Sequence, residues 1–254
     1  MMDRTKTGIQ GLDKALQGGI PEGNMVLISG GAGTGKSTLC LQFLVNGATL
    51  FGEKGLYIST EQTEAELHRH AEKFGWNLKA LEDKIMVKFA FFDITEGDDF
   101  LSKLDVLIKE FKPKRIVVDS MTTLTDALII SGMGEKGPFS LVQVAETVSP
   151  IPRTEQIVSK SILYKLIAEL KKYRVTTLLT SELSEEIKAL SADGISEFIT
   201  DGVVILHYLE IGVADYRSMV IRKMRYSDHD KDVIPYNITS TGITVVEEGA
   251  KPGL

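Results

Sequence analysis

Cysteine is almost absent from this chain of 254 residues, which contains Cys40 and no other. One thiol can form neither a disulfide framework within the chain nor a metal site built from cysteines. Cys40 stands between Leu39 and Leu41, in a segment that we expect to be helical. We therefore interpret it as a small buried hydrophobic residue and not as a reactive thiol.

The chain also lacks long apolar runs and an excess of basic residues. No apolar stretch approaches the length of about 20 residues that a membrane-spanning helix needs, and the polar residues 1–6 lead into no apolar core of a signal sequence. The net charge is -6 and the isoelectric point about 5.4. The whole chain therefore does not attract polyanions, although a local basic patch is not excluded. We expect a soluble, cytoplasmic protein with no membrane partner.

What the chain does have is the composition of a folded domain. Hydrophobic residues make up 43% of the sequence, which excludes a disordered chain. The length suits one α/β domain spanning residues 1–254. We find no internal repeat or low-complexity tract in the sequence.

Short β-rich runs alternate with helical patterns, which predicts a mostly parallel central sheet flanked by helices. The predicted core strands are residues 25–29, 55–60, 85–92, 115–120 and 175–181. The predicted helices are residues 62–74, with Thr63 and Glu66 in capping-box spacing, 100–111 and 157–173. Beyond Gly202 the runs 203–209, 217–225, 236–239 and 242–246 follow one another without helical patterns. We expect these runs to form an antiparallel C-terminal extension of the sheet.

One long segment interrupts the alternation. Residues 124–155 include a glycine-rich run at 131–138 and the prolines Pro150 and Pro152. A connection of this length between core elements is uncommon and tends to be functional or mobile. Inside it, residues 141–148 are compatible with a short helix or strand.

Residues 30–37 fit the phosphate-binding pattern of a P-loop, placed between a predicted strand and a predicted helix. Its glycines let successive backbone N–H groups turn toward phosphate oxygens, and the helix that follows adds its positive dipole end. An accidental glycine-rich turn is disfavoured by the strand before it and the helix after it. We expect ATP or GTP to contact Gly30, Gly31, Ala32, Gly33, Thr34, Gly35, Lys36, Ser37 and Thr38.

Individual side chains of this loop have predicted tasks. Lys36 would reach the β- and γ-phosphates, and the Ser37 hydroxyl would hold Mg²⁺. Asp119 follows the apolar residues 116–118 of the predicted strand and has the form of a Walker B carboxylate, which holds Mg²⁺ through water. The alternative is that Asp119 only caps the next turn; the P-loop earlier in the chain favours the metal role.

Glu61 follows a second apolar strand, at residues 55–60. Ligands of open parallel sheets lie outside the carboxyl ends of the strands, so we expect Glu61 beside the γ-phosphate. There it can orient and deprotonate the attacking water. The alternative is an acidic residue that stabilises the first turn of the following helix; we favour the catalytic role.

A pair of cations marks the predicted strand at 217–225. Strand alternation places Lys223 and Arg225 on one face, with Arg222 and Met224 on the other. Such a pair is often only a solvated strand face. The two cations could instead reach the phosphates of a nucleotide bound to a neighbouring subunit.

Taken together, these residues resemble the KaiC-like branch of the RecA and RadA ATPases. The resemblance extends from about Lys6 to Val246 and rests on the segments 7–13, 18–23, 30–37, 57–61, 117–120, 176–182, 194–201, 223–230 and 241–243. This ordered series is far more specific than a P-loop alone. It implies a RecA-like P-loop NTPase fold.

The resemblance also implies a function: a Mg²⁺-dependent ATPase that releases ADP and assembles as a homo-oligomeric ring, typically a hexamer, with ATP at subunit interfaces. In this family the position of Glu61 is the catalytic base, and that of Asp119 is the Walker B acid. Lys223 and Arg225 match fingers that act in trans. Ser181 matches a sensor of the γ-phosphate, and His229 lies in a segment that approaches the nucleotide of the neighbour. The protein on which such a ring acts is not specified by these residues.

Two departures limit what the resemblance implies. KaiC-type sites usually carry two adjacent glutamates, whereas this chain has Gln62 after Glu61. Gln62 can orient water but cannot accept its proton, so we expect hydrolysis to be slow or to depend wholly on Glu61. KaiC has two tandem ATPase domains and a phosphorylated C-terminal segment, so a clock-like autokinase role is not expected for this chain.

Two other classes share parts of these motifs. A DNA-binding recombinase of the RadA type would pass DNA along loops corresponding to residues 122–154 and 182–196, but these loops have little basic character, so DNA is not favoured. A P-loop kinase of small molecules needs a second substrate pocket with arginines and a mobile lid, which Arg153 and its long loop could imitate.

Overall fold

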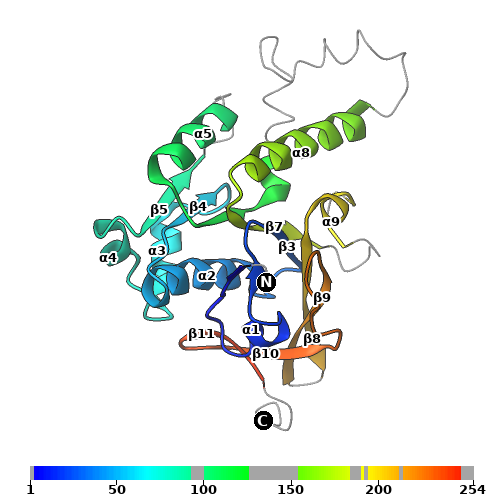
Figure 1. The fold of residues 1–254 in the computed structure, drawn as a ribbon. Coiled ribbons are helices and arrows are strands. Elements are labelled where there is room, and N and C mark those ends of the chain that lie inside the picture. The colour runs from blue at the N-terminus through cyan, green and yellow to red at the C-terminus, as the bar shows by residue number, and fades with distance from the viewer. Residues whose placement is uncertain are drawn as a thin grey trace.

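The computed structural model of the chain describes residues 3–92, 100–125, 154–183, 190–191, 194–211 and 214–246. The segments 141–148 and 131–138 lie outside the described residues. Figure 1 shows a broad central sheet with helices packed on both of its faces. The expectation of a mostly parallel sheet with helices and an antiparallel C-terminal portion is confirmed.

The main sheet of the described residues has nine strands in the order β11-β10-β9-β8-β3-β7-β6-β4-β5. The strands β8, β3, β7, β6, β4 and β5 are mutually parallel, and β9, β10 and β11 continue the sheet antiparallel. Their bounds are β3 Met25–Gly30, β4 Gly55–Ser59, β5 Val87–Phe91, β6 Arg115–Asp119, β7 Thr176–Glu182, β8 Gly202–Ile211, β9 Ala214–Met224, β10 Ile234–Thr239 and β11 Gly242–Val245.

The helices are α1 Leu12–Ala15, α2 Lys36–Leu50, α3 Glu64–Glu72, α4 Leu78–Asp83, α5 Phe100–Phe111, α8 Thr154–Lys172 and α9 Ser196–Ile199. Two short strands, β1 Arg4–Thr5 and β2 Ile20–Pro21, form a separate two-stranded sheet. The capping box predicted at Thr63 and Glu66 is present, although α3 is shorter than the predicted helix 62–74. The sequence did not predict the short elements α1, α4, α9, β1 and β2.

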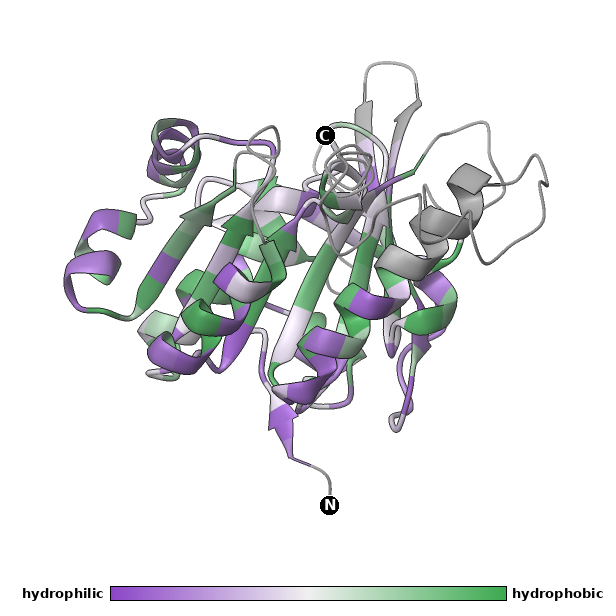
Figure 2. Ribbon diagram, turned by 90° about the horizontal axis from the view of Figure 1, so that it is seen from above, coloured by the Kyte–Doolittle hydropathy of each residue, from purple (hydrophilic) through white to green (hydrophobic). Residues whose placement is uncertain are grey.

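Alternating strand residues separate two apolar cores. On β3, Val26 and Ile28 pack with α2 and α3 on one face of the sheet, whereas Met25 and Leu27 pack with α5 and α8 on the other. Both faces of these parallel strands are thus covered, which explains their nearly continuous apolar sequences. Figure 2 shows the largely hydrophobic strands between helices that also carry hydrophilic residues.

A buried arginine connects the first core to the beginning of β6. Arg115 begins β6 and is fully buried; its guanidinium lies 2.6 Å from Glu53 and stacks over the ring of Phe43 at 4.5 Å. Gly47 on α2 makes room for it, because a Cβ at this position would lie 2.4 Å from Arg115 Nε. The helix interior therefore needs glycine here in spite of its low helix propensity.

Candidate active site

The P-loop connects β3 to α2 in the predicted way. Gly33 has a φ of 72°, and Gly35, the N-cap of α2, has a φ of 92°. At Gly30 a Cβ would lie 2.7 Å from the carbonyl oxygen of Leu206, so any side chain would collide with backbone. The glycines thus permit a turn that brings backbone N–H groups to the N-terminus of a helix of 15 residues.

Neighbouring strands brace this loop. The hydroxyl of Tyr236 on β10 donates to the carbonyl oxygen of Thr34 at 2.5 Å, and Thr34 Oγ1 donates to the carbonyl of Gly31 at 2.9 Å. Arg217 on β9 donates through Nε to the carbonyl of Gly33 at 3.4 Å, and its guanidinium lies over the Tyr208 ring. The antiparallel extension therefore supports the loop from the side.

Lys36 places a cation inside the loop. Its Nζ donates to the carbonyl oxygens of Gly30 and Gly31, each at 2.9 Å. Within the described part of the chain, no carboxylate forms an ion pair with this ammonium. An ammonium group without an anionic partner at a helix N-terminus is a site for an anion, so the loop fits the phosphates of a nucleotide.

The next two residues of α2 differ in what surrounds them. Ser37 is half-buried in the first turn. The Thr38 hydroxyl lies 3.0 Å from Nε2 of His70 on α3. The side chain of Thr38 is thus used to dock α3, and its predicted nucleotide contact would have to come from its backbone.

Asp119 ends β6 at the same edge of the sheet. Its carboxylate is buried and accepts two hydrogen bonds of 2.5 Å, one from the Tyr57 hydroxyl on β4 and one from Thr180 Oγ1 on β7. Burial raises the pKa of Tyr57 well above its ordinary value, and the charge of Asp119 raises it further, so this hydroxyl stays a donor. Carboxylates held in this way are suited to bind Mg²⁺ through water.

Glu61 lies next to the end of β6. Ser120 Oγ and Thr123 Oγ1 both donate to Glu61 Oε1, the second at 2.6 Å. Since Ser59 of β4 pairs with Asp119 of β6, the two carboxylates predicted to serve the nucleotide come from adjacent strand ends. Gln62 follows in a turn closed by Ser59, and its side-chain oxygen is buried without a hydrogen-bond partner in the described chain.

Ser181 lies on β7, directly beside the strand that precedes the P-loop. It pairs in register with Ser29 of β3 and is fully buried. β7 thus separates the P-loop strand from the Asp119 strand, so a residue at its end can report on both. Thr180, one residue earlier, is the one that contacts Asp119.

Lys223 and Arg225 lie at the opposite side of the sheet, where the parallel strands begin. Gly202, at the beginning of β8, pairs with both Val26 and Met224, so this end of β9 stands beside the beginning of β3. Lys223 Nζ donates to the carbonyls of Glu197 at 2.9 Å and Thr200 at 2.5 Å.

Arg225 is held by the same short helix α9. It donates to the Phe198 carbonyl at 3.2 Å and to Asp201 Oδ1 at 3.3 Å. Lys223 and Arg225 share a face, as expected, although the register with β8 shifts at Arg222 and leaves that residue without a partner. Because of this bulge, Ile221 and Met224 both belong to the first core in spite of their spacing of three.

His229 lies in the loop after β9, near that same edge. Its Nδ1 lies 2.8 Å from the carbonyl oxygen of Asp230, and the Asp230 N–H donates to the carbonyl of Ala15 in α1. The structure therefore brings together residues 30–37, Glu61, Asp119 and Ser181 at one edge, and places Lys223, Arg225 and His229 at the other.

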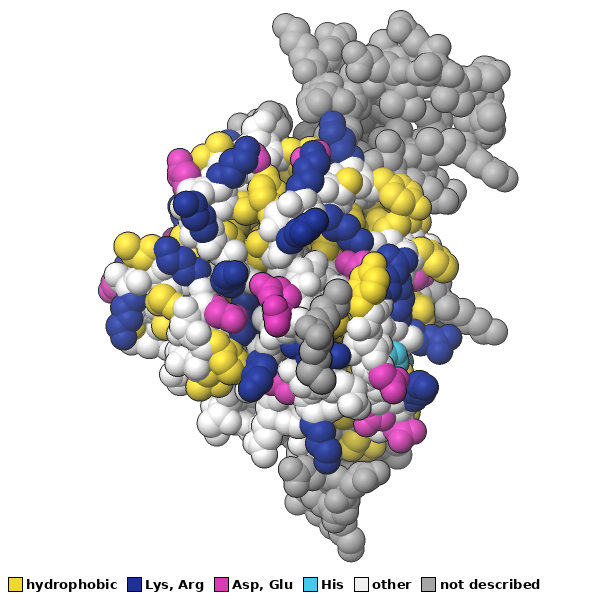
Figure 3. All heavy atoms as spheres, in the orientation of Figure 1, with side chains coloured by type: hydrophobic (Ala, Val, Ile, Leu, Met, Phe, Trp, Pro, Cys, Tyr) yellow, Lys and Arg dark blue, Asp and Glu magenta, His cyan; other side chains and the backbone are white. Residues whose placement is uncertain are grey.

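Two further features bear on the sequence analysis: the burial of Cys40 and the distribution of charged residues on the surface. Cys40 is buried, and burial raises its pKa well above its ordinary value, as expected for an inert core residue. Basic, acidic and apolar side chains are interspersed on the face shown in Figure 3.

Basic residues do gather in one cleft of about 310 Å³, which includes Lys109, Lys112, Lys114 and Arg174. Lys109 pairs with Asp105, and Lys114 with Glu22.

The fold and the P-loop site together define a protein of the RecA-like P-loop ATPase class. The chain matches the profile described as "ATPase: KaiC" over residues 5–130 and 142–250, so it belongs to the KaiC family of ATPases. Membership of this family implies nucleotide binding. The resemblance found in the sequence is thereby confirmed.

Individual relatives agree with this assignment. The circadian clock oscillator protein KaiC of Nostoc sp. is 32% identical over 260 residues, covering 98% of this chain and 45% of KaiC. A UPF0273 protein of Thermotoga maritima is 32% identical over 264 residues and 96% of both chains. The crystal structure of a KaiC-like protein of Pyrococcus horikoshii superimposes with a TM-score of 0.79 at 32% identity, covering 97% of this chain and 100% of that one.

The lengths of these relatives differ. The chain spans about half the length of the curated KaiC proteins that it matches, and nearly the whole of the Thermotoga protein. Among the described helices, none has the length and apolar character needed to cross a membrane.

Proposed function

We propose that this chain binds ATP with Mg²⁺, hydrolyses it to ADP and phosphate, and does so between neighbouring copies in a homo-oligomeric ring, expected to be a hexamer. The observation that carries the proposal is that the candidate site residues are divided between the two ends of the strands of one sheet. The P-loop, Glu61 and Asp119 occupy one edge, and Lys223 with Arg225 the other. Each copy thus presents two complementary halves.

Distance supports a division between subunits. β3 has six residues, so its two ends are separated by about 17 Å. Lys223 and Arg225 lie beside its beginning, whereas residues 30–37 follow its end. Their side chains are too short to reach a nucleotide in their own P-loop, so any contact with phosphates requires another copy. A head-to-tail arrangement that closes into a ring repeats this contact at every interface.

The residues at the ends of β3 and β6 would bind the nucleotide and its metal ion. Backbone N–H groups of residues 30–37 and the ammonium group of Lys36 would bind the phosphates. Ser37 and Asp119 would hold Mg²⁺, with Tyr57 and Thr180 fixing the Asp119 carboxylate. The bound ion supplies charge neutralisation on the phosphate oxygens.

The hydrolytic step needs a base. We assign it to Glu61, which would take a proton from water as the water oxygen bonds to the γ-phosphorus and the bond to ADP breaks. Its Oε1 is oriented by Ser120 and Thr123, which leaves Oε2 for the water. Lys223 and Arg225 of the neighbouring copy would stabilise the charge that develops on the transferred phosphoryl group. The resulting change in the ring is proposed to be regulatory, acting through a protein partner of unknown identity.

Glu61→Gln tests the assignment of the base. The amide keeps the shape of the side chain but cannot accept the proton, so we expect turnover to fall by about 10²–10⁴ while ATP affinity is preserved. Glu72→Gln, an exposed carboxylate on α3, is the control. Phosphate release and equilibrium binding of ATP are the two measurements. Unchanged turnover in Glu61→Gln would remove Glu61 from this role.

Mixing two inactive variants tests the interface. The Lys36→Ala variant lacks the lysine of the P-loop but retains Lys223. The Lys223→Ala variant lacks Lys223 but retains an intact P-loop. In a randomly mixed ring about a quarter of the interfaces combine an intact binding half with an intact Lys223, so activity should return partially. Arg222→Ala, at the unpaired residue of the bulge, is the control and should be active alone. Mixtures no more active than their components would contradict catalysis in trans.

A further inference from the structure

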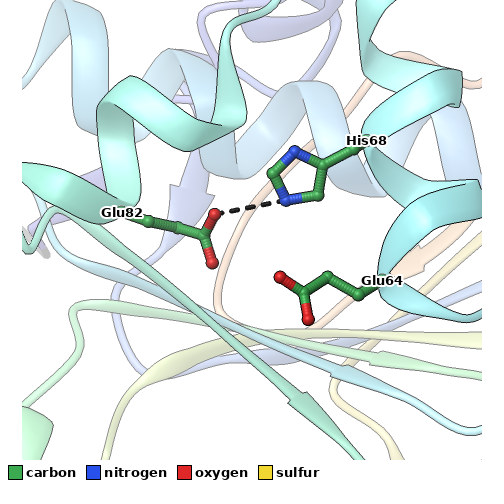
Figure 4. A group of neighbouring side chains, drawn as sticks. All are labelled: Glu64, His68 and Glu82. Carbon is green, nitrogen blue, oxygen red and sulfur yellow. Dashed lines mark ion pairs between the residues drawn. The ribbon is translucent and has the colours of Figure 1, made fainter.

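A second group of potential metal ligands lies outside the nucleotide site, between α3 and α4. Glu64 and His68 are four residues apart on α3 and therefore project from the same side of this helix. Glu82 comes from α4. Figure 4 shows the three side chains converging on one space, and one ligand atom from each lies within 4.8 Å of the others.

The polar atoms in this space are only partly paired, and the one ion pair among them, marked in Figure 4, joins His68 to Glu82. His68 Nε2 and Glu82 Oε2 are buried and 3.2 Å apart, yet neither has a hydrogen-bond partner with proper geometry in the described chain. No described cation pairs with Glu64, and the nearby Lys79 of α4 is paired with Asp83 at 3.2 Å. Two carboxylates and one imidazole nitrogen thus face one another without a group that neutralises both carboxylates. Buried polar atoms of this kind call for an explanation.

From this arrangement we propose that Glu64, His68 and Glu82 bind one divalent transition-metal ion of the Zn²⁺ class. Zinc bonds of about 2.0–2.1 Å in tetrahedral geometry separate two ligand atoms by about 3.4 Å, close to the 3.2 Å between His68 and Glu82. Glu64 is exposed, so its carboxylate can rotate inward to complete the set. Three protein ligands leave the fourth position to water.

The ligand types define which metals compete. An imidazole nitrogen favours Zn²⁺, Co²⁺ or Ni²⁺ over Mg²⁺ and Ca²⁺, which prefer oxygen ligands alone. The ring of His68 also packs against Phe89 on β5, with ring centroids 6.1 Å apart, which limits its movement. The ion would join α3 to α4 at the β5 edge of the sheet and thus brace the helix that begins three residues after Glu61.

Metal titration of the whole protein tests the proposal. After removal of metals with a chelator, Zn²⁺ binding is measured by calorimetry and Co²⁺ binding by visible absorption, both with excess Mg²⁺ and no nucleotide. Mg²⁺ occupies sites made of oxygen ligands, such as one at Asp119, and leaves the histidine site free. We expect one Zn²⁺ to bind per chain. Bound Co²⁺ should give the visible absorption of a four-coordinate ion. Binding of no more than a trace of Zn²⁺ would overturn the proposal.

Substitutions identify the ligands. His68→Asn and Glu82→Gln should each weaken Zn²⁺ binding by about tenfold or more, since each removes one of three ligands. Glu64→Gln, on the exposed ligand, should do the same without disturbing the fold, which keeps the test valid if a buried variant unfolds. His207→Asn and Glu72→Gln are the matched controls and should bind as the parent does. Zn²⁺ affinity that survives His68→Asn and Glu64→Gln would show that the ion binds elsewhere.

A protonated histidine between two carboxylates is the competing explanation, and NMR separates it from metal binding. Zn²⁺ should shift the ring signals of His68 at constant pH, and the shift should saturate at one equivalent. If only a change of pH moves these signals, the group is an ion pair and the proposal is wrong. None of these measurements depends on ATPase activity, so they stand apart from the proposed hydrolysis.

Discussion

Asp119 is the residue at which the polar interactions of three strands meet. Tyr57 on β4 and Thr180 on β7 donate to its two carboxylate oxygens from either side of β6. Hydrogen bonds to a charged group are about twice as strong as neutral ones and fix its orientation. The metal-binding carboxylate proposed for the nucleotide site is therefore held in place by the sheet before any ligand arrives.

Tyr57→Phe tests this arrangement. The variant keeps the ring in the core but removes one donor from a buried carboxylate, so the free energy of unfolding should fall by about 1.5–3 kcal/mol. Denaturant unfolding without nucleotide measures it. Tyr226→Phe, with an exposed hydroxyl, should be neutral. In an Asp119→Asn background the effect of Tyr57→Phe should shrink; an equal loss in both backgrounds would mean that the Tyr57 hydroxyl acts elsewhere.

How far the site could be predicted depends on how local its signals are. The P-loop, Glu61 and Asp119 each stand at a strand end, and parallel strands bring such ends to one edge. Tyr57 and Thr180 gave no such signal, because alternation assigns a face to a residue but does not say which atoms meet across strands. Arg217 reaches the loop only through the pairing of β8 with β9, far away in the sequence.

At the level of elements, α2 is the helix on which the site is built. It begins at the P-loop and is buried along most of its length, with α3 docked on it through His70 and Thr38. Burial lowers the pKa of His70 below its ordinary value of 6.5, the charge of Lys73 lowers it further, and Asp119 acts in the opposite sense. The folded state thus prefers the neutral imidazole.

This preference predicts a pH dependence. Above pH about 6.5 the imidazole is neutral in both states, and its contribution to stability is fully present. As the pH falls below 6.5 toward the lower folded pKa, the unfolded state binds more protons and the free energy of unfolding falls. His70→Gln should flatten the pH profile in this window, as followed by denaturant unfolding. His207→Gln, on an exposed residue, should leave the slope unchanged, and an identical slope in His70→Gln would contradict the prediction.

Element boundaries were harder to predict than element types. The strand predicted from residue 85 begins at Val87, because Ile85 has a φ of 54° and turns the chain after α4. Asn77 caps α4 through Ala80 N–H, a signal that the sequence contained but a helix of six residues does not make conspicuous. The bulge at Arg222 interrupts the strand alternation, although Lys223 and Arg225, which both follow it, still donate to the same backbone segment around α9.

At the scale of the whole molecule, the edge that carries Lys223 and Arg225 also exposes two large aromatic side chains. Phe198 on α9 is 69% exposed and Tyr226 is 71% exposed. They adjoin the cations, since Phe198 accepts a hydrogen bond from Arg225 and Tyr226 follows Arg225 in the chain. Aromatic residues and arginine are enriched at the centres of protein interfaces. This end of the strands therefore has the composition expected of the face that is proposed to meet a neighbouring subunit.

Phe198→Ser and Tyr226→Ser should consequently weaken assembly while the fold is retained. Each removes apolar area that only a neighbour would bury, so the monomer should be as stable as the parent and the ring less populated. Light scattering after size-exclusion chromatography, with and without ATP, gives the mass. Val106→Ser, on the 50% exposed side chain of α5, is the matched control and should assemble normally. A ring that persists equally in all three variants would place the interface on another surface, and Lys223 and Arg225 would then have no route to a neighbouring nucleotide.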